Sequence, residues 1–409
     1  MSALSTDPHQ RLTLPFAEFV ALCALLVALT AMSIDIMLPA LPEIGEHFGV
    51  GDPNARQNVV VSYMLGFAVG QVFAGPVSDR FGRKPVIVAG LVLFAVATLA
   101  AVATTDFALL LAARFVQGLG GAAPRVVSVA IVRDLFAGRQ MARVLSYIMM
   151  VFIMVPVFAP AVGVGLIRVG DWTWTFGALL LTCLVATIWL MVRMPETRMV
   201  EDRVELTVAG LAAAGREVMT TRVTLVYAVA MGLMFGCLLG YVSSAQQVFA
   251  EAYGLGDLFP LAFGALALAM AVSSFTNAQL VGRLGMRRMS HLALAGFVAV
   301  ASVLVLVEIA GEPSLFVFCL AIGSCFLLFG MIVPNFNAMA MEPHGHVAGT
   351  ASSFLGFFTT ATGATIGWAV GQTYDGTSLP LAVGFATLSA AALVVVRLGD
   401  RRDPGPIAA

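Results

Sequence analysis

Charged side chains are scarce in this chain. Only 11% of its 409 residues are Asp, Glu, Lys or Arg, whereas 60% are hydrophobic, and the mean hydropathy is +0.95. A single soluble core cannot bury that much apolar surface. The composition therefore excludes an ordinary soluble domain and predicts a protein that crosses a membrane many times.

Cysteine is also rare, and the five that are present have no paired spacing, so neither disulfides nor a metal site are predicted from them. We expect them to be small core residues. They are Cys23, Cys183, Cys237, Cys319 and Cys325. The histidines have no ligand spacing either, and His344 and His346 are expected to lie in a solvated loop. No cofactor and no metal are therefore expected.

Two further absences bear on function. The sequence has no glycine-rich phosphate-binding loop, so any transport must use an ion gradient or passive flow, and no nucleic-acid partner is expected. It also has no apparent cluster of nucleophile, base or metal ligands, which an embedded enzyme would need. We therefore do not expect an enzyme.

Long apolar runs are what the sequence does contain. A helix needs about 20 apolar residues to cross a bilayer, and twelve stretches reach this length. The first lacks a cleavage site and is expected to stay in the mature protein. These spans, numbered 1 to 12, lie at 14–42, 54–77, 85–104, 107–133, 141–167, 172–193, 223–251, 257–281, 288–308, 314–339, 347–372 and 377–397.

The cations outside these spans fall almost entirely on one side. Only Arg56 and Arg168 lie on the other side. Because cytoplasmic loops carry the excess of Lys and Arg, both termini are predicted to be cytoplasmic.

A polar segment divides the spans six and six. The predicted parts are tails at 1–13 and 399–409, helix bundles at 14–194 and 222–398, and a cytoplasmic linker at 195–221. A shift of 203 residues places Gly82 on Gly285 but replaces Asp79 by Gly282. Two parallel six-helix halves are typical of one class of secondary transporters, whereas a channel would lack this repeat with its gate motif.

Three motifs carry a family resemblance. The turn after span 2 contains Gly75, Asp79, Arg80, Gly82, Arg83 and Lys84. Span 4 carries Arg114-Phe115-Val116-Gln117-Gly118-Leu119-Gly120-Gly121, and span 1 carries Asp35-Ile36-Met37-Leu38-Pro39-Ala40-Leu41-Pro42. With these motifs the chain resembles the major facilitator superfamily, its twelve-span drug/proton antiporters, and their bicyclomycin and chloramphenicol resistance branch.

The resemblance implies an all-α fold of two pseudo-symmetric six-helix bundles in a bacterial inner membrane. It implies that Asp35 exchanges protons and that Arg114 supports Asp35 in this role. It also implies that Asp79 holds an inner gate by accepting hydrogen bonds from backbone N–H groups at the start of span 11, with the basic residues of the turn as partners. The residues associated with export and bending in span 5 are Pro156, Pro160, Gly163 and Gly165. Departures in span 5 and at Asp171-Trp172-Thr173-Trp174 leave the substrate open.

Few charges lie inside the spans, and each is a functional candidate unless it is paired. At 1.5 Å per residue, Asp35 and Arg114 lie about 9 and about 10 Å below the outer boundary, so we expect them side by side. A fixed structural ion pair is the alternative. Arg125 shares a face with Arg114, and it either pairs with Glu18 or leaves the cavity positive.

The predicted function is a proton-coupled drug efflux antiporter that works by alternating access as a monomer. We expect small neutral or weakly charged amphipathic substrates, such as phenicol-type drugs. The alternative is an exporter or facilitator of a metabolite such as an amino acid, sugar or nucleoside. The predicted cavity residues are Arg125, Tyr63, Tyr147, Tyr241, Gln246, Asn335 and Asn337. Gly66 and Gly70 are expected to be packing residues.

Overall fold

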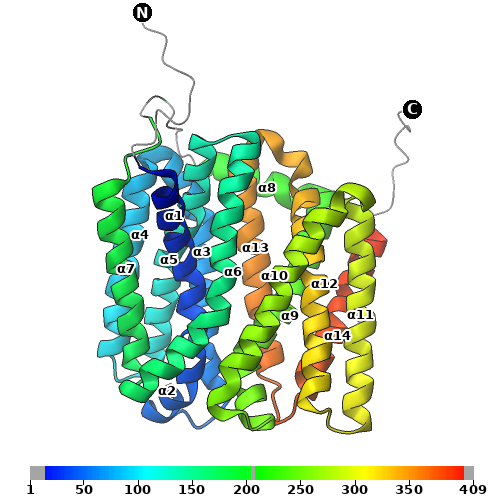
Figure 1. Cartoon of the computed structure of the whole chain (residues 1–409). Helices are drawn as coiled ribbons and strands as arrows, with labels where there is room; N and C mark the ends of the chain where they lie inside the picture. Colours follow the sequence, from blue (N-terminus) through cyan, green and yellow to red (C-terminus); the bar gives the residue numbers. More distant parts are fainter. Residues whose placement is uncertain (1–13, 200, 202, 204–207, 400–409) are drawn as a thin grey trace, which may run out of the picture. The chain divides into compact units, whose positions relative to one another are not determined.

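The computed structural model describes residues 14–199, 201, 203 and 208–399. In this part of the chain eleven helices are long and apolar enough to cross a membrane, and α13, with 24 residues, is a twelfth long helix. The predicted twelve-helix fold is thereby confirmed. The long helices are α1 Phe16–Asp35, α3 Asn58–Phe81, α4 Arg83–Ala103, α5 Phe107–Leu135, α6 Gly138–Val169, α7 Thr173–Arg193, α9 Arg222–Gln246, α10 Phe259–Leu284, α11 Met286–Ala310, α12 Leu315–Met341, α13 Ala348–Gly371 and α14 Leu379–Gly399 (Figure 1).

Shorter elements complete or join these helices. They are η2 Leu38–Ala40, α2 Leu41–His47, η3 Ala55–Gln57, α8 Val208–Thr220, the π-helical turn η5 Gln247–Ala252, η6 Gly256–Leu258 and η7 Glu342–Val347. The chain forms two compact units, Met1–Leu211 with Asp257–Gly264, and Ala212–Gly256 with Ala265–Ala409.

Span 1 is broken where the sequence predicted one continuous helix. The α-helix ends at Asp35, and a short 3-10 turn then leads into α2. Pro39 explains the position of the break, because a proline ring inside a helix collides with the carbonyl four residues earlier, which here belongs to Asp35. The break therefore places the only acidic residue in the interior of span 1 at a helix end.

Glycines let α3 and α5 pack backbone against backbone in the first unit. A Cβ atom at Gly66 would lie 1.9 Å from the Phe115 carbonyl oxygen, and one at Gly118 would lie 2.0 Å from that of Tyr63. At Gly70 the nearest atoms would be 2.6 and 2.7 Å away. Close approach of this kind holds membrane helices together through dispersion forces. Gly66 and Gly70 are thus packing residues, as predicted.

The internal repeat is visible in the helix boundaries. Helix α3 ends at Phe81 and α4 begins at Arg83, and the shift of 203 residues places these boundaries on the end of α10 at Leu284 and the start of α11 at Met286. The glycines between them, Gly82 and Gly285, have φ of 101° and 76°. Such values strain any residue with a Cβ atom, so both halves use the same glycine turn.

The polar linker contains a helix that the sequence did not predict. Helix α8 has 13 residues, and its part from Ala212 onward belongs to the second unit. It packs against α13, since a Cβ atom at Gly215 would lie 2.8 Å from the ring of Phe354. Val218, on the same helix, is buried.

Candidate functional site

Arg114 is fully buried in the first unit and its guanidinium is held by acceptors on three helices. It donates to the Val59 carbonyl oxygen at 3.1 Å, to the Ser33 carbonyl oxygen at 2.8 Å, and to the side chain of Gln117. The rings of Tyr63 and Phe176 lie 4.7 and 5.7 Å from its Cζ atom. A buried guanidinium with this many partners is a fixed structural connection between α5, α3 and α1.

Asp35 is buried, with 5% of its surface exposed, and has a different environment. Its carboxylate makes no hydrogen bond and no salt bridge with any residue that the structure describes. The expected ion pair with Arg114 is therefore not formed, because the guanidinium binds the Ser33 carbonyl, two residues earlier. This leaves an unpaired carboxylate next to a helix break.

Gly163 of α6 contacts the break beside Asp35. A Cβ atom there would lie 2.4 Å from the Ile36 carbonyl oxygen and 2.7 Å from Pro39. Gly165, by contrast, has open space where its Cβ would be. Helix α6 continues through both Pro156 and Pro160, so of these four residues Gly163 has the clearest structural role.

Arg125 and Glu18 do not pair with each other. The Glu18 carboxylate accepts from Arg193 at 2.7 Å and from the Trp189 indole at 3.1 Å. Arg125 is partly exposed, with Cζ 4.8 Å from the centre of the Phe152 ring. It has no hydrogen bond or ion pair within the described residues. Arg125 is thus a guanidinium in a membrane span that lies over an aromatic ring and pairs with no described acid.

The charged turn is organised around Arg83, whose side chain is 5% exposed. Its guanidinium binds Asp79 at 2.7 Å, Asp134 at 2.8 Å and the Ser78 hydroxyl at 2.7 Å. Asp79 itself is 34% exposed, so part of its carboxylate stays accessible. Arg80 is exposed and its guanidinium lies over the ring of Phe81, and the Gly75 carbonyl accepts from Ser78 at 2.8 Å.

A further carboxylate, that of Glu196 just after span 6, binds residues at the end of the turn. Glu196 accepts from the backbone N–H groups of Arg83 at 2.9 Å and Lys84 at 3.1 Å, which are the first two residues of α4. Helix N-termini have unpaired N–H groups and a partial positive charge, so an anion there is stabilising. A Cβ atom at Gly82 would lie 2.6 Å from a Glu196 carboxylate oxygen. Two features therefore favour glycine at position 82: its positive φ, and the Glu196 carboxylate that occupies the space of a Cβ atom.

Lys84 makes the reciprocal connection. Its ammonium donates to the carbonyl oxygens of Met191 and Met194 at 2.9 and 2.8 Å, at the end of α7. A cation at a helix C-terminus satisfies carbonyls that have no partner in the helix. The start of α4 and the end of α7 thus cap each other, and we call this pair of contacts the inner staple.

Sequence reasoning missed two acids of this network. Asp134 was overlooked because it stands beside Arg133 at the end of span 4, where charges are ordinary. Glu196 falls in the segment 195–221, which the sequence predicted only as a polar linker. Helix α4 begins after Gly82, which has no side chain to cap the helix start. The missing cap could have prompted a search for an acid elsewhere in the chain, such as Glu196.

The predicted cavity residues lie in different surroundings. Tyr63 is buried beneath Arg114, whereas Tyr147 is partly exposed and stacks edge-on against Phe16. In the second unit, Tyr241 packs against Phe326, and Gln246 is buried with a side-chain oxygen that has no partner. Asn335 is buried and donates to Asn277 at 2.7 Å, and Asn337 is exposed.

The expectation for His344 is wrong. The sequence suggested a solvated loop, but the residue is completely buried and bonded through both ring nitrogens. The side chain of His346 lies outside the described residues. Among the described residues no group of three or more His, Cys, Asp or Glu could hold a metal ion.

Comparison with known proteins decides the family. The family model described as Major Facilitator Superfamily matches residues 23–371. The chain belongs to the Major Facilitator Superfamily. It is also 32% identical over 366 residues to the bicyclomycin resistance protein homolog of Haemophilus influenzae, a match that covers 89% of this chain and 91% of that protein.

Two further proteins are similar over a shorter length or in fold. The match to multidrug resistance protein D of Escherichia coli is 36% identical over 177 residues, 43% of this chain and 45% of that protein. The crystal structure of the human organic anion transporter MFSD10 has a TM-score of 0.71 at 19% identity, covering 95% of this chain and 100% of that chain. At this identity the likeness concerns the fold only.

Proposed function

We propose that this superfamily member is a proton-coupled drug exporter of a bacterial inner membrane, working by alternating access. The names of two relatives, a bicyclomycin resistance protein homolog and a multidrug resistance protein, support drugs as the substrate class. Small neutral or weakly charged amphipathic compounds, including phenicol-type drugs, are the proposed cargo.

The observation that carries the proposal is the state of Asp35. An unpaired carboxylate charge inside a membrane costs at least about 2.5 kcal/mol, and binding a proton removes that charge. Because Arg114 is already occupied by three acceptors, it does not neutralise Asp35. The Asp35 carboxylate can then hold a proton while it is shielded from water, and release that proton when water reaches the carboxylate.

Asp79 is the proposed inner gate residue. Within the first unit it shares Arg83 with Asp134, which also lies 3.9 Å from the guanidinium of Arg198. The exposed part of Asp79 has unused acceptor capacity, which supports a further, state-dependent donor. Its contact with the start of span 11 stays a prediction.

The test of proton coupling is drug accumulation in proteoliposomes under an imposed pH gradient. Asp35→Asn is expected to abolish uphill accumulation because it cannot exchange a proton, while downhill exchange of substrate continues. Glu46→Gln is the matched control, since Glu46 is an exposed acid on α2 and its replacement leaves the buried carboxylate unchanged.

Uphill accumulation by Asp35→Asn at the wild-type level would exclude Asp35 as the proton site. If instead the wild-type protein moves amino acids, sugars or nucleosides but no drug, the proposed cargo is wrong and the metabolite alternative holds.

A further inference from the structure

A buried histidine in the second unit joins the linker helix to the bundle. His344 follows α12, and its side chain is 1% exposed. Its Nδ1 atom lies 3.1 Å from a carboxylate oxygen of Glu217 on α8. Its Nε2 atom lies 2.8 Å from the hydroxyl of Thr224 on α9. The ring therefore joins the consecutive helices α8 and α9 to a segment that follows them by more than a hundred residues.

The hydrogen bonds around this ring specify its protonation. The Thr224 hydroxyl lies 2.9 Å from the Ala340 carbonyl oxygen, which can only accept, so the one hydroxyl proton is used there. Nε2 must then donate to the hydroxyl oxygen. An ionised Glu217 carboxylate also only accepts, so Nδ1 must donate as well. All four groups are satisfied together only when His344 is a doubly protonated, charged imidazolium.

The groups that face His344 come from each neighbouring segment. Helix α8 contributes Glu217, α9 contributes the Thr224 hydroxyl, and the end of α12 contributes the Ala340 carbonyl. Glu342 is exposed, and Arg222 on α9 donates instead to the carbonyl oxygens at the end of α14. Glu217 is thus the acid that is placed to form a salt bridge with the His344 ring.

We propose that His344, Glu217 and Thr224 form a proton-dependent latch that holds the linker helix α8 on the second unit. The inference goes beyond the proposed drug transport, and it concerns regulation by cytoplasmic pH. When the ring loses a proton, only one N–H remains. Either Glu217 then faces a lone pair, or Thr224 turns away from Ala340. The first outcome leaves the buried Nδ1 atom without a donor, and the second leaves the Ala340 carbonyl without one, so the hold on α8 weakens.

Hydrogen exchange of the backbone amides of residues 215–221 tests the latch in the full-length protein in detergent or nanodiscs. Rates are measured between about pH 5.5 and about pH 8.5, the range in which histidine titrates, and are divided by the intrinsic rate at each pH. We expect protection of these amides to fall by about tenfold or more towards high pH, since hydrogen bonds to charged groups are stronger than neutral ones.

Glu217→Gln removes the acceptor charge with little change of shape. The amide can accept from Nδ1–H or donate to the Nδ1 lone pair, so protection is expected to lose its dependence on pH. Glu342→Gln is the matched control, because this exposed acid is two residues from His344, and it should behave as wild type.

Corrected protection of α8 in the wild-type protein that does not change with pH would overturn the proposal without any variant. A Glu217→Gln protein with the full wild-type pH dependence would also overturn it. Unchanged exchange in α14 serves as the internal check that the bundle stays folded.

Discussion

Arg114 and Arg125 stand on the same helix, yet their surroundings assign them different tasks. Arg114 is fully buried and donates to protein acceptors on three helices. Arg125 lies over the ring of Phe152 and has no hydrogen bond or ion pair among the residues that the structure describes. An intramembrane cation of this kind favours ligands that bring acceptors and disfavours ligands that bring positive charge. We therefore propose that Arg125 selects substrates by their charge.

Replacing Arg125 tests this filter. In Arg125→Gln we expect transport of a lipophilic cation to rise relative to a neutral drug by about tenfold, which corresponds to about 1.4 kcal/mol of removed repulsion. Arg125→Lys keeps the charge and should keep the wild-type ratio. The ratio is measured with both compounds in the same vesicles. A ratio that is equal in all three proteins would show that Arg125 does not select for charge.

At the scale of elements, the tight contact between α3 and α5 makes a second prediction. Gly118→Ala places a methyl group where the Tyr63 carbonyl lies, and overpacking costs about 1 to 3 kcal/mol even where side chains can adjust. Since backbone cannot adjust in that way, we expect a clear loss of thermal stability in detergent.

Gly165→Ala is the matched control, because its Cβ would meet no atom within 4 Å. It should leave the melting temperature equal or raise it, since alanine is the better helix former. Equal melting temperatures for Gly118→Ala and wild type would mean that the helices are less tightly packed than described.

The twelve long helices could be predicted because length and hydropathy alone determine them. The break in span 1 was missed, since the run stays apolar and the deciding feature is the four-residue spacing from Asp35 to Pro39. The inner staple was missed for another reason. It joins Glu196 to residues more than a hundred positions earlier, and local sequence contains no information on such pairs. The burial of His344 depends in the same way on α8, whose short helix gave no membrane signal.

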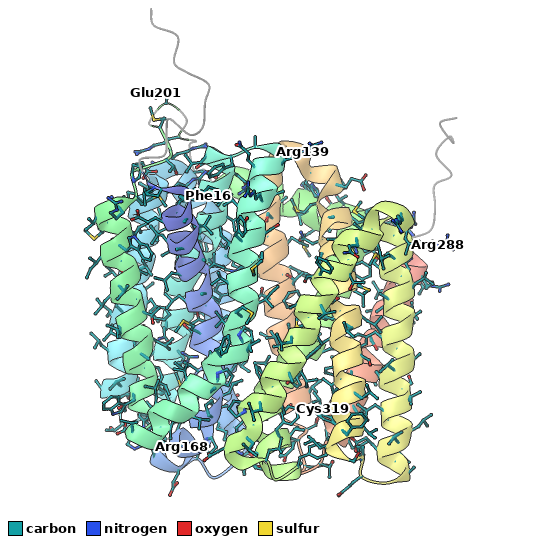
Figure 2. The ribbon with its side chains drawn as sticks, in the orientation of Figure 1. Phe16, Arg139, Arg168, Glu201, Arg288 and Cys319 are labelled. Carbon is teal, nitrogen blue, oxygen red and sulfur yellow. The ribbon has the colours of Figure 1, made fainter. Side chains whose placement is uncertain are left out.

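At the scale of the whole molecule, the distribution of cations predicts orientation. Figure 2 shows Phe16 and Arg139 at one end of the first unit and Arg168 at the opposite end. The sequence assigns most cations of the chain to the same side as Arg139, so the positive-inside rule predicts that this end faces the cytoplasm.

Single cysteines in a cysteine-free background test this orientation. In intact right-side-out cells, a membrane-impermeant maleimide should label Arg168→Cys, whose native side chain is 65% exposed, and should leave Arg139→Cys unlabelled until the membrane is opened. Labelling of Arg139→Cys alone in intact cells would reverse the topology, and with it the side on which the inner staple lies.

The inner staple also has a consequence for biosynthesis. Arg83 and Lys84 emerge from the ribosome long before their capping carboxylate, because Glu196 follows Arg83 by 113 residues. During that interval the first turn of α4 has no Glu196 to accept from its N–H groups, although spans 2 and 3 are already made. The first unit can close only after span 6 has been translated. A chain truncated before Glu196 should therefore be a substrate for membrane proteases, whereas one that ends just after it has every residue that the staple requires.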